Sequence, residues 1–181
     1  MDTYASWIIT MHKRKWEKNM YISKWWGDLI GGSDDSLALI DYLEQLDSTD
    51  VTLNQILKDL GLDVLLSEGD LKSGGSIGFD IKNANGMFRA ELDIACSALI
   101  DLSAIVLESQ KSGYVDLHDL DENRQPCKLY IDASEEKRNL LRDELYKFSR
   151  NPLAYELAEL VPADDMIELA EKAKMIADEL V

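Results

Sequence analysis

The sequence predicts an α+β fold: N-terminal helices, an antiparallel sheet of two hairpins around a central helix (ββαββ), and C-terminal helices. Apolar residues recur at helical spacing in the first and last thirds of the chain, and alternate with polar residues in the middle. With 181 residues, 46% of them apolar, the chain can build one sizeable core. We therefore expect a single domain over 1–181 in four consecutive parts: 1–30, 31–66, 67–133 and 134–181.

The first part, 1–30, is predicted to be a basic, tryptophan-rich helical head. Residues 1–26 carry a net charge of +3 and all four tryptophans. Four apolar residues near its end follow helical spacing: Ile22, Trp25, Trp26 and Leu29. Basic residues beside tryptophan also suit a membrane surface or stacked bases. Because +3 is modest and the adjoining chain is acidic, we expect Trp7, Trp25 and Trp26 to help fill the core.

The sequence pattern over residues 31–66 predicts acidic helices. Ser33 or Asp34 suits the N-cap of the first, near 35–47. Its apolar stripe consists of Leu37, Ile40, Leu43 and Leu46. Thr52 begins a capping-box pattern that opens a second, short helix, which Gly61 can end.

Residues 77–94 predict a β-hairpin, because the apolar period changes there from 3.6 to 2. Asn85-Gly86 suits the two central positions of a type I′ turn. That turn predicts three apolar pairs on one face: Ile77 with Ile94, Phe79 with Leu92, and Ile81 with Ala90. On the other face it predicts pairs of like charge: Asp80 with Glu91, and Lys82 with Arg89.

Residues 95–110 fit either a buried helix or a strand, and their length and Ala/Ser content favour a helix that stops at Gly113. A second hairpin is expected next, with strands at 115–118 and 127–131 around a turn at 121–125.

The last third predicts three helices. Ser134 suits the N-cap of the first, and Pro152 the first position of the second. Pro162 breaks that helix, and Asp164 or Asp165 suits the N-cap of the last.

The charge is strongly uneven and indicates a basic partner. The formal net charge is −16, which disfavours direct nucleic-acid binding. Residues 28–70 hold eleven acidic residues against Lys58 alone, beyond what solubility requires. A surface of one sign attracts a partner of the other sign. We therefore predict a partner-binding surface of acids with tryptophan anchors: Asp34, Asp35, Asp41, Glu44, Asp47, Asp50, Trp25 and Trp26.

No motif indicates catalysis, a cofactor or a metal. Asp119, Asp121 and Asn123 begin like a calcium loop, but Arg124 and Tyr130 stand where that loop needs Gly and Glu. No glycine pattern matches a phosphate-binding loop, and no run of 18 apolar residues occurs. We expect a cytoplasmic protein that is not an enzyme, with no cofactor, no metal and no membrane span. The oligomeric state stays open.

In composition and size alone, the chain resembles immunity proteins that neutralise bacterial toxins and phage proteins that mimic DNA. The resemblance implies electrostatic and steric occlusion of a basic active site or nucleic-acid groove. A DNA mimic needs carboxylates along a phosphate-like track, and here fourteen basic residues follow residue 26. The favoured prediction is therefore an immunity-type inhibitor of a basic toxin or effector. A DNA mimic, a small enzyme with dispersed carboxylates, and a scaffold docking through its head are the alternatives.

Overall fold

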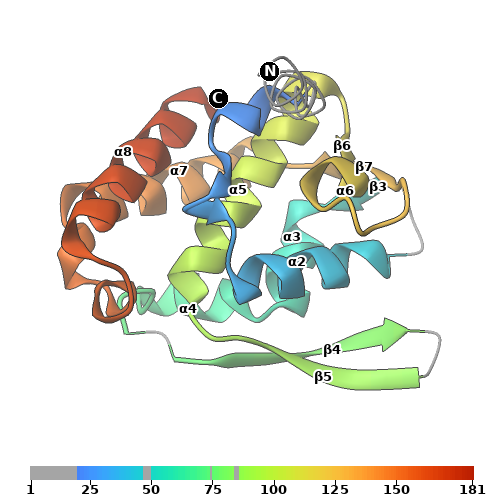
Figure 1. Ribbon diagram of the computed structural model, residues 1–181, viewed down its shortest axis with the longest axis horizontal. Helices are drawn as coiled ribbons and strands as arrows, with labels where there is room; N and C mark the ends of the chain where they lie inside the picture. Colours follow the sequence, from blue (N-terminus) through green and yellow to red (C-terminus); the bar gives the residue numbers. More distant parts are fainter. Residues whose placement is uncertain (1–19, 47–49, 74, 84–85) are drawn as a thin grey trace, which may run out of the picture.

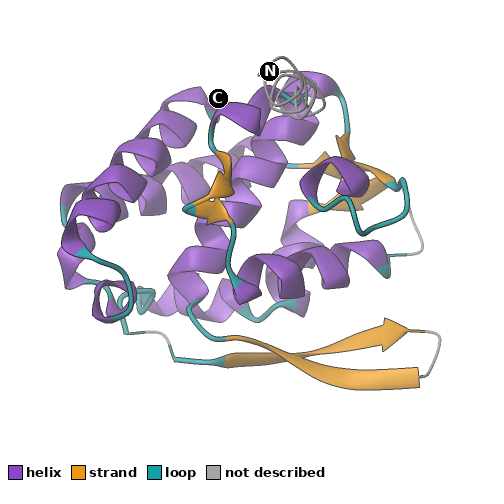
Figure 2. Ribbon diagram, viewed as in Figure 1, coloured by secondary structure: helices purple, strands orange, loops and turns teal. Residues whose placement is uncertain are grey.

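The computed structural model describes residues 20–46, 50–73, 75–83 and 86–181. Figure 1 shows the arrangement of these helices and strands, which are, in chain order, η1 (Tyr21–Lys24), β1 (Trp26–Asp28), β2 (Ile30–Gly31), α2 (Asp34–Glu44), β3 (Asp50–Thr52), α3 (Leu53–Asp59), α4 (Leu62–Glu68), β4 (Ile77–Asn83), β5 (Gly86–Leu92), α5 (Ala95–Ser112), β6 (Val115–Asp116), α6 (Leu117–Leu120), β7 (Lys128–Asp132), α7 (Glu135–Arg150), η2 (Pro152–Ala154), η3 (Glu156–Glu159) and α8 (Ala163–Glu179). The mixture of long helices and small separate sheets in Figure 2 confirms the α+β class.

Helix α5 is the centre of the molecule. It runs through the middle of Figure 1, with α7 and α8 on one side and α2, β6 and β7 on the other. Its side chains are buried on every face from Ala95 to Ser109 apart from Ser97, as expected for a core helix. Gly113 ends it at φ +82°. The helix predicted over 95–110 is confirmed, and the strand alternative is wrong.

The described end of the predicted head is not a helix. One 3-10 turn, η1, leads into the short parallel strands β1 and β2. Gly27 and Gly31 both have positive φ values, which interrupt a right-handed helix. Trp25 is buried, as the core interpretation predicts, and Trp26 packs against the core. The remainder of the predicted head, 1–19, lies outside the described residues.

The N-caps predicted for α2 and α3 are confirmed, but the reciprocal half of the capping box at Thr52 is not, because the Gln55 side chain donates to Asp59. The Ser33 hydroxyl accepts the N–H of Ser36, and Thr52 accepts the N–H of Gln55. The predicted apolar stripe of α2 is partly wrong, because Leu37 is 44% exposed. Helix α2 instead buries Leu39 and Tyr42 beside Ile40 and Leu43, and it buries the polar side chains Asp35 and Ser36 as well. Helix α4 follows Gly61 and was not predicted.

The β4–β5 hairpin forms as predicted, but its register differs by two residues. Phe79 pairs with Ala90, and Asn83 pairs with Gly86, so the two-residue loop is 84–85. A shift of two preserves the predicted faces but changes every partner. Asp80 therefore lies opposite Arg89 and forms an ion pair of 3.4 Å with it. The predicted pairing of like charges is therefore wrong, because the observed register places Asp80 opposite a cation.

The second antiparallel pair, β6–β7, also forms, but the two hairpins do not share a sheet. Strand β7 pairs in parallel with β3, and β4–β5 stands alone. The predicted strand 115–118 is cut short because α6 begins at Leu117. The Asp116 carboxylate caps that helix through the N–H of His118 and also accepts the N–H of Cys127.

The C-terminal helices pack as an antiparallel pair beside α5 (Figure 1). Ser134 caps α7 by accepting the N–H of Lys137, as predicted. Pro152 holds the first position of the next element, as predicted, but the predicted helix is replaced by two 3-10 turns, η2 and η3, because Tyr155 between them is extended. Helix α8 begins earlier than predicted, at Ala163 directly after Pro162, so Asp164 and Asp165 lie in its first turn, where a carboxylate favours the helix dipole.

Candidate functional site

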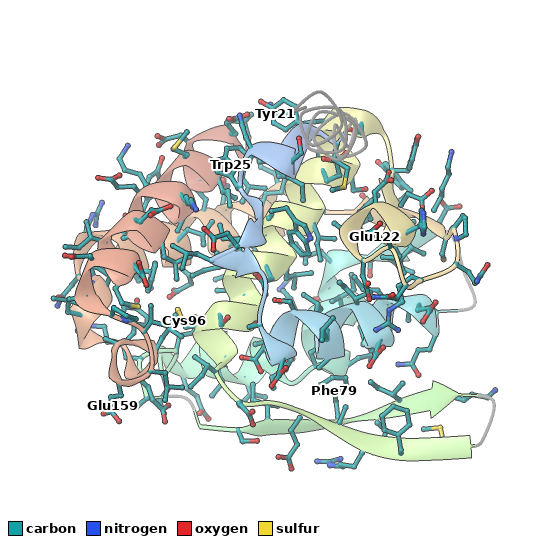
Figure 3. All side chains as sticks on the ribbon, in the orientation of Figure 1. Tyr21, Trp25, Phe79, Cys96, Glu122 and Glu159 are labelled. Atoms are coloured by element: carbon teal, nitrogen blue, oxygen red, sulfur yellow. The ribbon has the colours of Figure 1, made fainter. Side chains whose placement is uncertain are left out.

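A hollow of about 440 Å³ lies where the end of α2, the free end of the hairpin and the loop before β7 meet. We call it the α2–hairpin hollow; its lining residues are Asp41, Glu44, Gln45, Ile81, Lys82, Phe88 and Arg124. It contains two of the predicted partner-binding acids. A second hollow, of about 500 Å³, lies near the labelled Glu159 in Figure 3 and contains none of the predicted site residues.

The free end of the hairpin carries exposed apolar side chains. Phe88 lies opposite buried Ile81, so it continues the apolar face of the hairpin to the point where the core ends. It is 41% exposed, and its neighbour Met87 is 66% exposed. Aromatic residues and methionine surrounded by charged residues are typical of the energetic centre of a protein interface.

Arg124 gathers three carboxylates at the hollow. Its Nη1 lies 2.9 Å from Glu44 Oε2 and also pairs with Asp41, while its Nε lies 3.0 Å from Asp121 Oδ2. Burial lowers the pKa of Arg124, but hydrogen bonds to Glu44, Asp121 and Asp41 outweigh it and raise that pKa overall. The pKa of Asp121 is lowered, first by the backbone N–H of Asn123 and then by Arg124. The hollow is therefore lined by carboxylates already ordered by one guanidinium.

Sequence reasoning missed Arg124, which it considered only as a departure from a calcium loop. Arg124 lies eighty residues from Glu44, and no spacing rule joins an arginine to carboxylates so far away along the chain. The only local signal was Asp121, three residues earlier.

Replacing Arg124 with methionine is expected to lower the free energy of unfolding by about 1–2 kcal/mol in low salt, since three carboxylates would then face one another without a cation. The loss shrinks in 1 M salt. Denaturant unfolding measures both values. The control is Lys174→Met, which removes only an exposed pair with Asp178 on α8 and is expected to cost much less stability than Arg124→Met. Equal losses for the two variants contradict a structural role for the cluster.

Two of the predicted site residues are buried and serve the fold. The Asp35 carboxylate accepts the N–H groups of Asp93 and Ile94 at 2.6 and 3.1 Å, which fixes the backbone directly before α5. Burial raises the pKa of Asp35 in spite of these hydrogen bonds. Trp25 is buried beneath Lys24, whose Nζ lies 4.0 Å from the ring centroid. We therefore leave both residues out of the surface considered below.

The other predicted residues do not converge on the hollow. Asp34 is exposed at the opposite end of α2, and Asp50 is exposed on β3, in a different sheet. Trp26 is half-buried, and its Nε1 donates to the Leu120 carbonyl at 3.1 Å. Asp47 lies outside the described residues. The structure thus brings together Asp41 and Glu44 from the predicted set, and adds Phe88 and Arg124.

Within the described ranges, no group of three or more His, Cys, Asp or Glu side chains is placed to hold a metal ion. Nor does any helix of that part of the chain have the length and apolar character needed to cross a membrane. Cys96, labelled in Figure 3, lies in the first turn of α5, and burial raises the pKa of its thiol, so the unreactive protonated form dominates.

One comparison with known proteins identifies a family. The family model described as Immunity protein 68 matches residues 21–180, from η1 to the end of α8, and so includes the whole α2–hairpin hollow. No curated protein and no solved structure gives a significant match to the chain.

Proposed function

This chain belongs to the Immunity protein 68 family, and from that premise we propose that it neutralises a basic toxin by binding it and covering its active surface. In this proposal the protein acts in the cytoplasm, by occlusion, without catalysis and without a cofactor. The observation that supports it best is the α2–hairpin hollow, where exposed Phe88 adjoins ordered carboxylates.

In the proposed interface, apolar residues provide affinity and charged residues speed the encounter with the partner. Phe88 and Met87 supply apolar surface that a partner can remove from water, which is where interface affinity concentrates. Glu44 and Asp41, at the rim, and the net charge of −16 accelerate encounter with a cationic surface. Because Arg124 already fixes both carboxylates, binding costs less side-chain entropy than it would with free side chains.

The same geometry disfavours a DNA mimic. A mimic presents unpaired carboxylates along a regular track, whereas Arg124 draws Asp41, Glu44 and Asp121 toward one point. Apolar anchors also have no counterpart in a phosphate backbone. Binding that survives high salt favours the toxin interface, and binding that collapses steeply with salt favours the mimic.

The proposal is tested by co-purification from the native cell, identification of the bound protein, and titration of that protein with purified variants. Phe88→Ala is expected to weaken binding by about 10- to 100-fold, because hot-spot aromatic residues contribute at that scale. The matched control is Leu160→Ala, which truncates a 71% exposed apolar residue outside the hollow and is expected to leave affinity unchanged. A partner that is not a toxin, or equal affinities for the two variants, rejects the proposal.

A further inference from the structure

We propose that the outer edge of β5 pairs with an extended strand of the toxin, which then becomes the third strand of the β4–β5 sheet. This inference rests on the proposed function and specifies how the toxin is held. The hairpin lies along one side of the molecule in Figure 1, and no other described strand pairs with either of its edges.

The hairpin geometry shows which backbone groups face outward. The loop at 84–85 is closed by the pair Asn83–Gly86, and the next residue, Lys82, donates its N–H to Gln45 Oε1 at 2.5 Å, away from β5. In an antiparallel ladder, successive residue pairs alternate. The backbone N–H and C=O groups of one pair bond each other between the strands, and those of the next pair point away from the partner strand. The outward set on β5 is therefore Met87, Arg89 and Glu91.

Neither proline nor a bulge blocks strand pairing at this edge, whose charged side chains are Arg89 and Glu91. Proteins shield edges with proline, bulges, charged side chains or covering elements. Strand β5 runs for seven residues in unbroken register with no proline and no bulge, and its side chains from Gly86 to Arg89 are all exposed. On β4, by contrast, Gln45 already occupies one outward N–H. The unpaired edge is therefore that of β5, the strand that also supplies Phe88 to the lining of the α2–hairpin hollow.

The charges favour a toxin strand over a second copy of this chain. Two copies of this chain carry a net charge of −16 each and repel each other, which disfavours the pairing of one β5 edge with another. A strand with an apolar residue opposite Met87 and a cation opposite Glu91 satisfies both positions. The exposed Asp93 just beyond β5 adds to the attraction for that cation.

The test compares two proline variants that differ only in the edge they block. Asp80 and Arg89 form one cross-strand pair with outward backbone groups, so either proline removes one outward N–H and the same ion pair, and neither removes a ladder bond. Arg89→Pro blocks the β5 edge, and Asp80→Pro blocks the β4 edge. The co-purified toxin is expected to bind Arg89→Pro at least about ten-fold more weakly than Asp80→Pro, the scale of one or two lost hydrogen bonds. Circular dichroism and unfolding curves of the two variants are used to check that both are folded.

A second arm does not depend on the toxin and so separates the two hypotheses. The probe is a blocked seven-residue peptide with lysine at position 2, valine at positions 4 and 6, and threonine elsewhere. Antiparallel pairing of position 4 with Arg89 sets this lysine opposite Glu91 and the last valine opposite Met87, and amide NMR follows the binding. We expect shifts centred on Met87, Arg89 and Glu91 that disappear in Arg89→Pro and persist in Asp80→Pro. The same peptide with glutamate in place of its lysine is the charge control, and it is expected to shift none of these amides because it sets a carboxylate opposite Glu91. Shifts elsewhere, no shifts, or equal behaviour of the proline variants overturn the edge proposal, even if the toxin binds. Peptide shifts at the edge with no toxin among the co-purified proteins reject the proposed function alone.

Discussion

Replacing Asp101 with alanine is expected to lower the free energy of unfolding by about 2–4 kcal/mol at pH 6, because two buried donors lose their acceptor. Asp101 lies inside α5 and is 1% exposed. One carboxylate oxygen accepts the N–H of Gly31 at 2.9 Å, and the other accepts the hydroxyl of Ser36 at 2.6 Å. This single side chain therefore joins β2 and the first turn of α2 to the central helix.

Asp101 also makes stability depend on pH in an unusual direction. Burial raises its pKa to about 7 against an ordinary value of 3.8, and the hydrogen bonds from Ser36 and Gly31 only partly oppose that rise. Between pH 4 and 7 the folded state therefore holds a proton that the unfolded state releases. The sign of this linkage is that stability falls as pH rises through that window.

The comparison with Asp101→Asn isolates this effect. Asparagine keeps an acceptor for Gly31 and can donate to Ser36 Oγ, but it does not titrate. From pH 5 to pH 7.5 the wild type is expected to lose more unfolding free energy than Asp101→Asn, as measured by denaturant titration at each pH. Parallel pH profiles for the wild type and Asp101→Asn would show that Asp101 does not titrate in this window. An Asp101→Ala variant as stable as the wild type would contradict the structural role of this side chain.

Gly31→Ala is expected to cost about 2–5 kcal/mol, the sum of backbone strain and overpacking. Gly31 has φ +82°, which L side chains rarely adopt, and an added Cβ would lie 2.3 Å from Cε2 of Trp26. The indole cannot simply swing away, because its Nε1 donates to the Leu120 carbonyl.

The control for Gly31 is Gly69→Ala. Gly69 has a similar φ of +71°, but an added Cβ meets nothing within 4 Å. Its loss is expected to be about 1 kcal/mol, from the backbone alone. Thermal and denaturant unfolding of both variants measure the difference. If the two losses are equal, contact with Trp26 contributes nothing and only the left-handed backbone matters.

The parts of the fold that the sequence predicted well are governed by local chemistry. Ser33, Thr52 and Ser134 cap helices because their hydroxyls reach an N–H only a few residues away. The alternation over 77–83 specified the face of each hairpin residue, because that period follows from backbone geometry alone. The turn position was harder, since a shift of two residues leaves every apolar side chain on the same face.

The failures involve residues that meet only in three dimensions. Strand β3 pairs in parallel with β7, so that Val51 lies opposite Ile131, and no local sequence pattern predicts this pairing. The sequence analysis counted Asp35 as an exposed acid, yet this residue of α2 is buried and binds the backbone directly before α5. Composition identified the right class of protein, since the resemblance to immunity proteins agrees with the family match, but it assigned too much of the charge to a free surface.

The most direct test measures the activity of the co-purified toxin while this protein is titrated into it. Wild-type protein is expected to abolish that activity in a stoichiometric complex, and Phe88→Ala to require about 10- to 100-fold more protein for the same inhibition, while Leu160→Ala matches the wild type. A toxin that stays active when saturated with wild-type protein, or that Phe88→Ala inhibits as well as wild type does, contradicts neutralisation through the α2–hairpin hollow.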